Sequence, residues 1–136
     1  MAQPGEILFY EKYRFRDGSS ADKLFVILNA ADSATPCLVL KTTSRAERYA
    51  GTREGCNPAR KVFYIPDCWK ECLDKSTYVQ LPEIIPIPVS ELLKGSFDKR
   101  IRTIGTLTPN CLAQLKNCLK KHFRDDISPR NWKQIF

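Results

Sequence analysis

Hydrophobic runs alternate with short polar stretches along most of this chain. The first run covers residues 6–14, a polar turn follows at residues 17–20, and a second run starts at Lys23. β-Branched and aromatic residues bounded by Gly, Asp, Ser and Pro are typical of strands and turns. The pattern predicts strands at residues 6–14, 23–29, 37–42, 61–65, 77–81, 84–88 and 101–107.

Near the end of the chain the hydrophobic period changes to three and four residues, which predicts a helix over residues 109–123. Thr108 can cap this helix, and Pro109 suits its first turn. Shorter helical turns are expected at residues 68–73, 90–95 and 128–136. Many short strands followed by one C-terminal helix predict a mainly β fold, a small SH3-like β-barrel.

The length of 136 residues predicts a single domain, residues 1–136. The hydrophobic fraction of 43% argues against disorder. Neither a signal peptide nor a membrane span is evident, so we expect a cytoplasmic protein. Loops 15–22 and 43–60 are the longest irregular stretches, and the second is long enough to be functional.

The six cysteines, at positions 37, 56, 68, 72, 111 and 118, are expected to be reduced and packed as small hydrophobic residues. Cys68 with Cys72, and Cys118 with His122, are the pairs that a zinc site would use. Their spacing in a helix also places both residues on one face, as core packing requires. We therefore expect neither a metal nor a cofactor.

The net charge is +7, and basic residues concentrate in residues 41–61 and 94–102. Basic loops on a small domain favour an acidic partner, either nucleic acid or an acidic protein segment. The alternative is a solvated basic surface without a specific partner.

His122 is the only histidine and lies near a helix end, so a conventional histidine acid–base pair is excluded within one chain. The remaining polar cluster contains cations, hydroxyls and one carboxylate. RNA supplies its own nucleophile, the 2′-hydroxyl, and such side chains can stabilise the charge of the pentacoordinate phosphorane. The cluster consists of Arg14, Arg16, Asp17, Ser19, Ser20, Lys23, Thr42, Thr43 and Ser44.

The order of these motifs resembles the PemK/MazF family of toxin endoribonucleases. Gly5-Glu6 opens a strand, a Gly-Ser loop follows, and a later strand ends in Thr42-Thr43-Ser44. Residues 104–109 are similar to the terminal strand and helix start of that family. The resemblance covers both ends of the chain well and residues 44–100 loosely.

The resemblance implies a barrel of the PemK/MazF/CcdB type that cleaves single-stranded RNA without a metal, as the toxin of a toxin–antitoxin pair. It also implies a homodimer and an acidic antitoxin protein that covers the RNA groove. Lys23 takes the place of the catalytic cation, and Thr42 supplies the catalytic hydroxyl. The RNA-binding residues are expected to be Arg14, Arg16, Asp17, Ser19, Ser20, Thr43, Ser44, Arg45, Arg48 and Arg53.

Lys23-Leu24 stands where the family has Arg-Pro, and lysine lacks the planar fork with which arginine binds a phosphate. A lysine with a lowered pKa can act as an acid or base, or Arg14 or Arg16 can supply the cation. Otherwise Lys23 is an ordinary charge at a strand end. The alternative functions are a non-catalytic barrel that binds nucleic acid or an acidic protein segment, and a toxin that binds a protein such as a topoisomerase.

Overall fold

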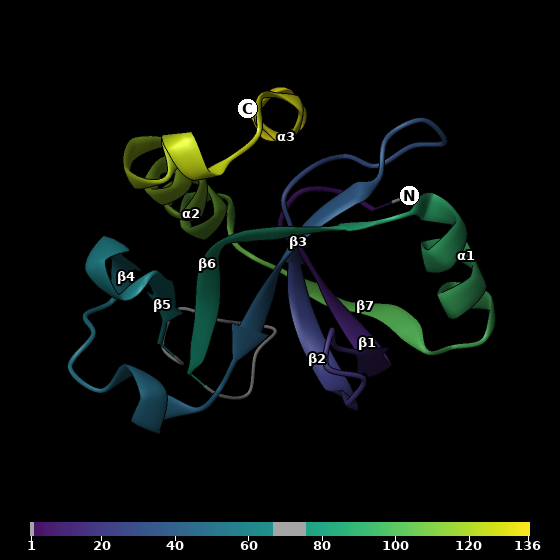
Figure 1. Cartoon of the computed structure of the whole chain (residues 1–136), viewed down its shortest axis with the longest axis horizontal. Coiled ribbons are helices and arrows are strands. Elements are labelled where there is room, and N and C mark those ends of the chain that lie inside the picture. The colour runs from purple at the N-terminus through teal and green to yellow at the C-terminus, as the bar shows by residue number, and fades with distance from the viewer. Residues whose placement is uncertain (1, 67–75) are drawn as a thin grey trace.

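The computed structural model describes residues 2–66 and 76–136, and within them one antiparallel sheet of seven strands dominates (Figure 1). The spatial order is β4-β5-β6-β3-β2-β1-β7, and the two outer strands do not pair with each other in the described residues. The sheet is therefore open there. Its strands are β1 (Glu6–Arg14), β2 (Ser20–Ile27), β3 (Cys37–Thr43), β4 (Gly55–Asn57), β5 (Val62–Ile65), β6 (Thr77–Ile87) and β7 (Ile101–Thr106).

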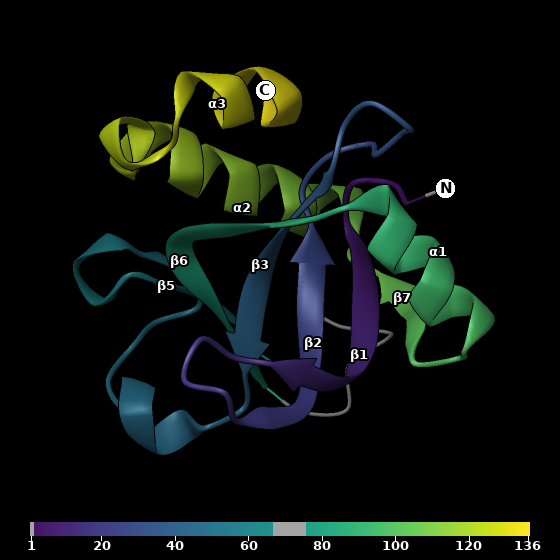
Figure 2. The same cartoon turned by 45° about the vertical axis from the view of Figure 1, so that its right-hand side comes forward.

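Three α-helices accompany the sheet in the described part of the chain: α1 (Val89–Phe97), α2 (Pro109–His122) and α3 (Pro129–Ile135). The α2 and α3 helices lie together at one end of the molecule, and α1 lies beside β1 and β7 (Figure 2). The Thr108 side chain accepts a hydrogen bond from the Cys111 amide and caps α2, as predicted. The short 3-10 turns are η1 (Ala46–Tyr49), η2 (Pro58–Arg60) and η4 (Arg124–Asp126).

The central strands are buried on both faces, and each face of the sheet packs against a different hydrophobic core. Ile7 and Leu38 belong to the core that α2 covers with Leu115 and Leu119. Their chain neighbours Leu8 and Val39 belong to the second core, which includes Leu92 of α1. Successive side chains of a strand point to opposite faces, so unbroken hydrophobic runs serve both cores.

The mainly β class is confirmed, and the element bounds differ in three main places. Strand β2 begins at Ser20 and not at Lys23, so it takes the last residues of the expected loop 15–22 and ends two residues early. The strands expected at 77–81 and 84–88 form the single strand β6. Its first part pairs with β5 on one side and with the end of β3 on the other, and its last part pairs with the start of β3. Loop 43–60 contains the unpredicted strand β4, which is only three residues long. The helical turn expected at 68–73 lies outside the described residues. Across the described residues, no helix is both long and apolar enough to cross a membrane.

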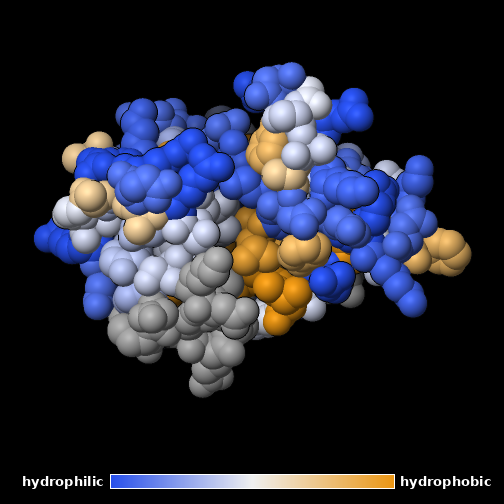
Figure 3. All heavy atoms as spheres, turned by 90° about the horizontal axis from the view of Figure 1, so that it is seen from below, coloured by the Kyte–Doolittle hydropathy of each residue, from blue (hydrophilic) through white to orange (hydrophobic). Residues whose placement is uncertain are grey.

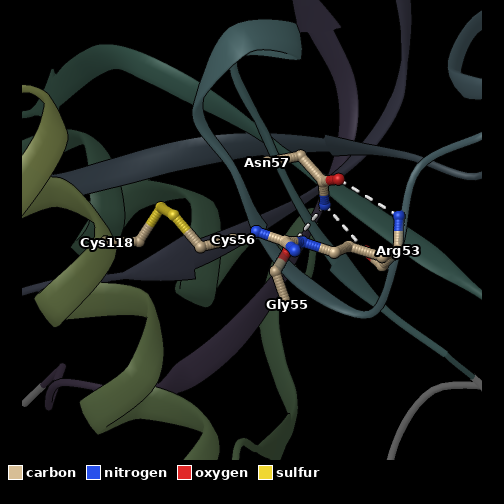
Figure 4. The surroundings of a disulfide bond; sticks show 5 residues. All are labelled: Arg53, Gly55, Cys56, Asn57 and Cys118. Atoms are coloured by element: carbon tan, nitrogen blue, oxygen red, sulfur yellow. Dashed lines mark hydrogen bonds between the residues drawn. A yellow bond between two sulfur atoms is a disulfide. The ribbon is translucent and has the colours of Figure 1, made fainter.

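The expectation that all cysteines are reduced is wrong for Cys56 and Cys118, which form a disulfide between β4 and α2 (Figure 4). The sequence did not reveal this bond because it depends on β4, which brings the two Cα atoms within 5.7 Å. The disulfide also occupies the sulfur that a Cys118–His122 zinc pair would need. Cys37 is a buried thiol, and burial raises its pKa to about 12. The expectation for Cys68 and Cys72 lies outside the described residues.

Candidate functional site

A groove of about 800 Å³ lies where β2 begins and β3 ends. These two places are adjacent because β2 and β3 pair antiparallel, with Phe25 opposite Lys41. The loop between β1 and β2, the segment after β3, and part of β6 complete the lining. Eight of the predicted site residues line the groove: Asp17, Ser19, Lys23, Thr42, Thr43, Ser44, Arg45 and Arg48.

The two candidate catalytic residues contact each other across the strands. The Lys23 ammonium donates a hydrogen bond to the main-chain carbonyl of Thr42 over 3.0 Å. The Thr42 hydroxyl donates to the carbonyl of Leu24 over 2.9 Å, and the residue is only 5% exposed. The hydroxyl proton of Thr42 therefore points into the sheet, while the hydroxyl oxygen keeps lone pairs that can accept.

Lys23 lies in a strongly cationic environment. Burial lowers the pKa of Lys23, and the charges of Lys41, Arg45 and Arg48 lower it further. The ammonium groups of Lys23 and Lys41 lie 5.8 and 6.0 Å from the centre of the Phe15 ring. Like charges held together in this way favour a bound anion, and they make it easier for a lysine to lose its proton.

The turn between β1 and β2 is held by Asp17 and Ser19. The Asp17 carboxylate accepts from the Ser19 hydroxyl over 2.6 Å and from the Ser19 amide over 2.9 Å. These bonds lower the pKa of the Asp17 carboxyl. Gly18 between them has φ +89°, which side-chain-bearing residues rarely adopt. Both polar residues therefore shape the rim of the groove, and Asp17 is already engaged.

Four predicted RNA-binding residues do not line the groove: Arg14, Arg16, Ser20 and Arg53. Arg14 and Ser20 face each other at the outer end of the β1–β2 pair. Arg16 forms an exposed ion pair with Glu83, 3.8 Å long.

The main chain of Arg53 is clamped by the Asn57 amide, which accepts from the Arg53 amide over 3.1 Å and donates to its carbonyl over 2.7 Å (Figure 4). Arg53 therefore belongs to the support of β4 and not to the groove lining.

The structure adds residues to the groove that the sequence did not single out, chiefly Lys41 and Gln80. The pairing of β3 with β6 shifts register between Leu40 and Thr42, so Lys41 lies at this irregularity. A register shift of this kind redirects a side chain beside a site. The sequence could have indicated Lys41 as a site residue, because a lysine within a hydrophobic strand is unusual. Gln80 carried no signal, because its position depends on the pairing of β6.

The groove also offers hydrophobic contact. Phe15, Leu24 and Ile104 are part of its lining beside the cations. On the molecular face drawn in Figure 3, a hydrophobic patch is exposed among hydrophilic residues, and the figure labels none of them. A single-stranded nucleic acid needs both kinds of surface, since its phosphates pair with cations and its bases pack on apolar groups.

The comparisons with known proteins assign no family: no protein-family model matches this chain, and no curated protein matches it either.

Proposed function

We propose that this protein is a metal-independent endoribonuclease that cleaves single-stranded RNA in the groove at the first half of β2 and the end of β3. The observation that carries the proposal is the direct contact of Lys23 with Thr42, surrounded by the charges of Lys41, Arg45 and Arg48. The resemblance to PemK/MazF toxins, noted from the sequence motifs, supports the same assignment for the same two residues.

The chemistry requires no external nucleophile. The 2′-hydroxyl attacks the adjacent phosphorus, the bond to the 5′-oxygen of the next nucleotide breaks, and a 2′,3′-cyclic phosphate forms. The proton of the 2′-hydroxyl passes to solvent water, and the departing 5′-oxygen gains one from the Lys23 ammonium. The Lys23 ammonium stabilises the phosphorane charge and, with its lowered pKa, is suited to donate the proton to the leaving oxygen. The Thr42 hydroxyl oxygen is available as an acceptor beside it.

The proposal includes an SH3-like barrel of the PemK/MazF/CcdB type, a homodimer, and a role as a toxin. The support for the fold is local: residues 6–43 form the expected three antiparallel strands, and β7 leads directly into a Thr-capped helix. An acidic antitoxin segment is the proposed partner, because its carboxylates match the same cations that would bind phosphates.

A second candidate is a barrel that binds nucleic acid or an acidic protein segment without cleaving it. The orientation of Thr42 favours this reading, because its hydroxyl proton is donated to the Leu24 carbonyl and not toward the groove. Lysine in place of arginine favours it as well, since one ammonium lacks the bidentate fork.

Incubation of the purified protein with single-stranded RNA in EDTA separates the two candidates. We expect fragments that end in a cyclic phosphate or a 3′-phosphate. Lys23→Ala, purified identically, controls for contaminating nucleases, and Lys121→Ala on α2 is a matched lysine variant outside the groove. Cleavage that needs an added divalent ion contradicts the mechanism. Binding without cleavage in the parent protein establishes the second candidate instead.

A further inference from the structure

A second hollow of about 230 Å³ adjoins the groove, because Lys41 and Gln80 line both. Tyr49, Arg60, Lys61 and Glu83 complete its polar and aromatic lining. Its volume corresponds to roughly eight water molecules of liquid, which is of the order of one nucleobase and too small for a folded nucleic acid. A strand held in the groove can therefore place a single base there.

A stack of three tyrosine rings supports the wall of this hollow. Tyr49 stacks on Tyr78 with ring centres 5.2 Å apart, and Tyr78 stacks on Tyr64 at 4.7 Å. Tyr64 and Tyr78 are direct partners in the β5–β6 ladder, which fixes their spacing. Tyr78 is buried, whereas Tyr49 is half-exposed at the hollow. The stack is a firm aromatic support, of the kind that packs against bases.

Two polar side chains hold Tyr49 in place. The Gln80 amide donates a hydrogen bond to the Tyr49 hydroxyl over 3.2 Å. The Arg60 guanidinium lies 5.9 Å from the Tyr49 ring centre and donates to the carbonyls of Ala50 and Arg48, at 2.9 and 2.7 Å. Arg60 thus ties the hollow to the segment that carries Arg48 of the groove. Its planar, fixed guanidinium is a further surface on which a base can stack.

Glu83 is the acidic residue among the cations of the hollow. Its ion pair with Arg16 is 3.8 Å long, and the two side chains are 57% and 96% exposed. Such exposed pairs contribute little, so the carboxylate can exchange this partner for a ligand at small cost. A carboxylate accepts two parallel N–H groups, and the adjacent Lys41 and Lys61 ammonium groups can only donate.

Guanine matches this arrangement better than the other bases. Its Watson–Crick edge carries two adjacent donors, N1–H and the N2 amino group, which a carboxylate can accept together. Its O6 and N7 atoms are acceptors on the neighbouring edge and suit the lysines. Adenine, cytosine and uracil each lack the pair of adjacent donors.

We propose that this hollow is the base-specificity subsite of the RNA groove and that it selects guanine through Glu83, with Gln80 and Arg60 as positioning residues for Tyr49. The inference rests on the proposed RNA-binding function and adds the base that the strand must present. The guanine stacks beside Tyr49 and Arg60, donates to the Glu83 carboxylate, and leaves its flanking phosphate near Lys41.

Fluorescence-anisotropy titration with 2′-O-methyl RNA hexamers tests the subsite without cleavage, since the blocked 2′-oxygen cannot attack. The probes are hexauridylate and hexamers with guanosine, inosine or adenosine at one internal position, each moved along the strand. We expect the best guanosine probe to bind about ten- to a hundredfold more tightly than hexauridylate, the range for hydrogen bonds to a charged group. Inosine, which lacks the N2 amino group, should lose a large part of that preference.

Three variants assign the preference to one carboxylate, with the ratio of guanosine to uridine affinity as the readout. Glu83→Gln should bring the ratio close to one. Arg16→Gln breaks the same ion pair but keeps the carboxylate, and should keep the ratio or raise it. Glu54→Gln makes the same charge change outside both hollows and should leave the ratio unchanged.

The outcomes separate this inference from the function on which it rests. RNA binding with equal affinity for all probes, or a guanine preference that survives Glu83→Gln, overturns the subsite and leaves the RNA groove standing. Failure to bind any of the single strands overturns both.

Discussion

The Lys23 ammonium is held by the main-chain carbonyl of Thr42 and not by a carboxylate. The two residues are 19 positions apart in the chain and meet because β2 and β3 pair antiparallel. Neither of the two ion pairs in the described residues involves Lys23. Its charge is therefore positioned but not neutralised, which is the condition under which a cation can act on a phosphate.

Replacing this cation should remove activity without unfolding the protein. We expect Lys23→Ala to lower the cleavage rate by roughly a hundred- to a thousandfold, the loss typical of one transition-state donor. Lys23→Arg should keep the rate or raise it, because the guanidinium adds a second donor to the phosphate. Initial rates on a fluorogenic RNA, with circular dichroism as the check on folding, measure both. Loss of activity in Arg14→Ala or Arg16→Ala, with Lys23→Ala neutral, would show that another cation is the catalytic one.

The alkaline limit of activity should depend on the charge of Lys41. The pKa of Lys23 is lowered by burial and by neighbouring cations, so Lys23 loses its proton at a lower pH than an exposed lysine does. If the ammonium form is the active one, the rate falls as pH rises through this lowered pKa. Lys41→Gln removes one repulsive charge, raises the pKa of Lys23, and should move the alkaline limb to higher pH. Lys120→Gln, on the exposed side of α2, should leave the pH of the alkaline limb unchanged. If Lys41→Gln also leaves that pH unchanged, the limb does not come from the titration of Lys23.

The Thr42 hydroxyl has a structural bond and a proposed catalytic role, which two substitutions can separate. Thr42→Val keeps the shape but leaves the Leu24 carbonyl without its donor, and should cost about 1–3 kcal/mol of unfolding free energy. It also removes the hydroxyl oxygen that can accept beside Lys23, and should slow cleavage. Thr42→Ser restores the hydroxyl and should recover the rate. Equal rates in the valine and serine variants would reduce Thr42 to a structural residue.

Local sequence patterns predicted the centre of the sheet and the longest helix. Strands β1, β2 and β3 are hydrophobic runs bounded by polar turn residues, whereas helix α2 has a clear hydrophobic period and Thr108 marks its start. The first half of one strand lies beside the end of the next in an antiparallel pair. The contact of Lys23 with Thr42 could therefore be predicted from the sequence. Eight of the twelve predicted site residues line the groove for that reason.

The features that the sequence did not predict depend on contacts between distant segments. Strand β4 is three residues long and has no readable period, and the Cys56–Cys118 bond follows from it. Pro82 has no N–H group to donate to a ladder. In the structure Pro82 lies between the part of β6 that pairs with β5 and the part that pairs chiefly with the first half of β3. The positions of Gln80 at the groove and of Glu83 at the adjoining hollow depend on how β6 pairs with β3 and β5.

The salt dependence of RNA binding should identify the arginines that touch the strand. Each phosphate neutralised contributes a log–log slope of about −0.7 for single strands, so three or four contacts give roughly −2 to −3. Arg45→Gln and Arg48→Gln should each flatten the slope by one such step, because both side chains line the groove. Arg53→Gln should behave like Arg130→Gln on α3 and leave the slope unchanged. A parent slope near zero would mean that the basic residues form only a solvated surface, and an acidic peptide would then fail to compete with RNA.

The Cys56–Cys118 disulfide should contribute strongly to stability, because it closes a long segment of chain. The two residues are 62 positions apart, and the chain-entropy relation gives about 4 kcal/mol for a loop of that length. The bond also anchors β4, whose Asn57 holds the main chain of Arg53 (Figure 4). Reduction should therefore lower the urea midpoint of the parent protein by an amount that approaches this value, and Cys56→Ala/Cys118→Ala should reproduce the loss. The double variant must no longer respond to the reductant, since a further shift would come from other cysteines. A parent midpoint that is the same with and without reductant would show that the bond carries no stability.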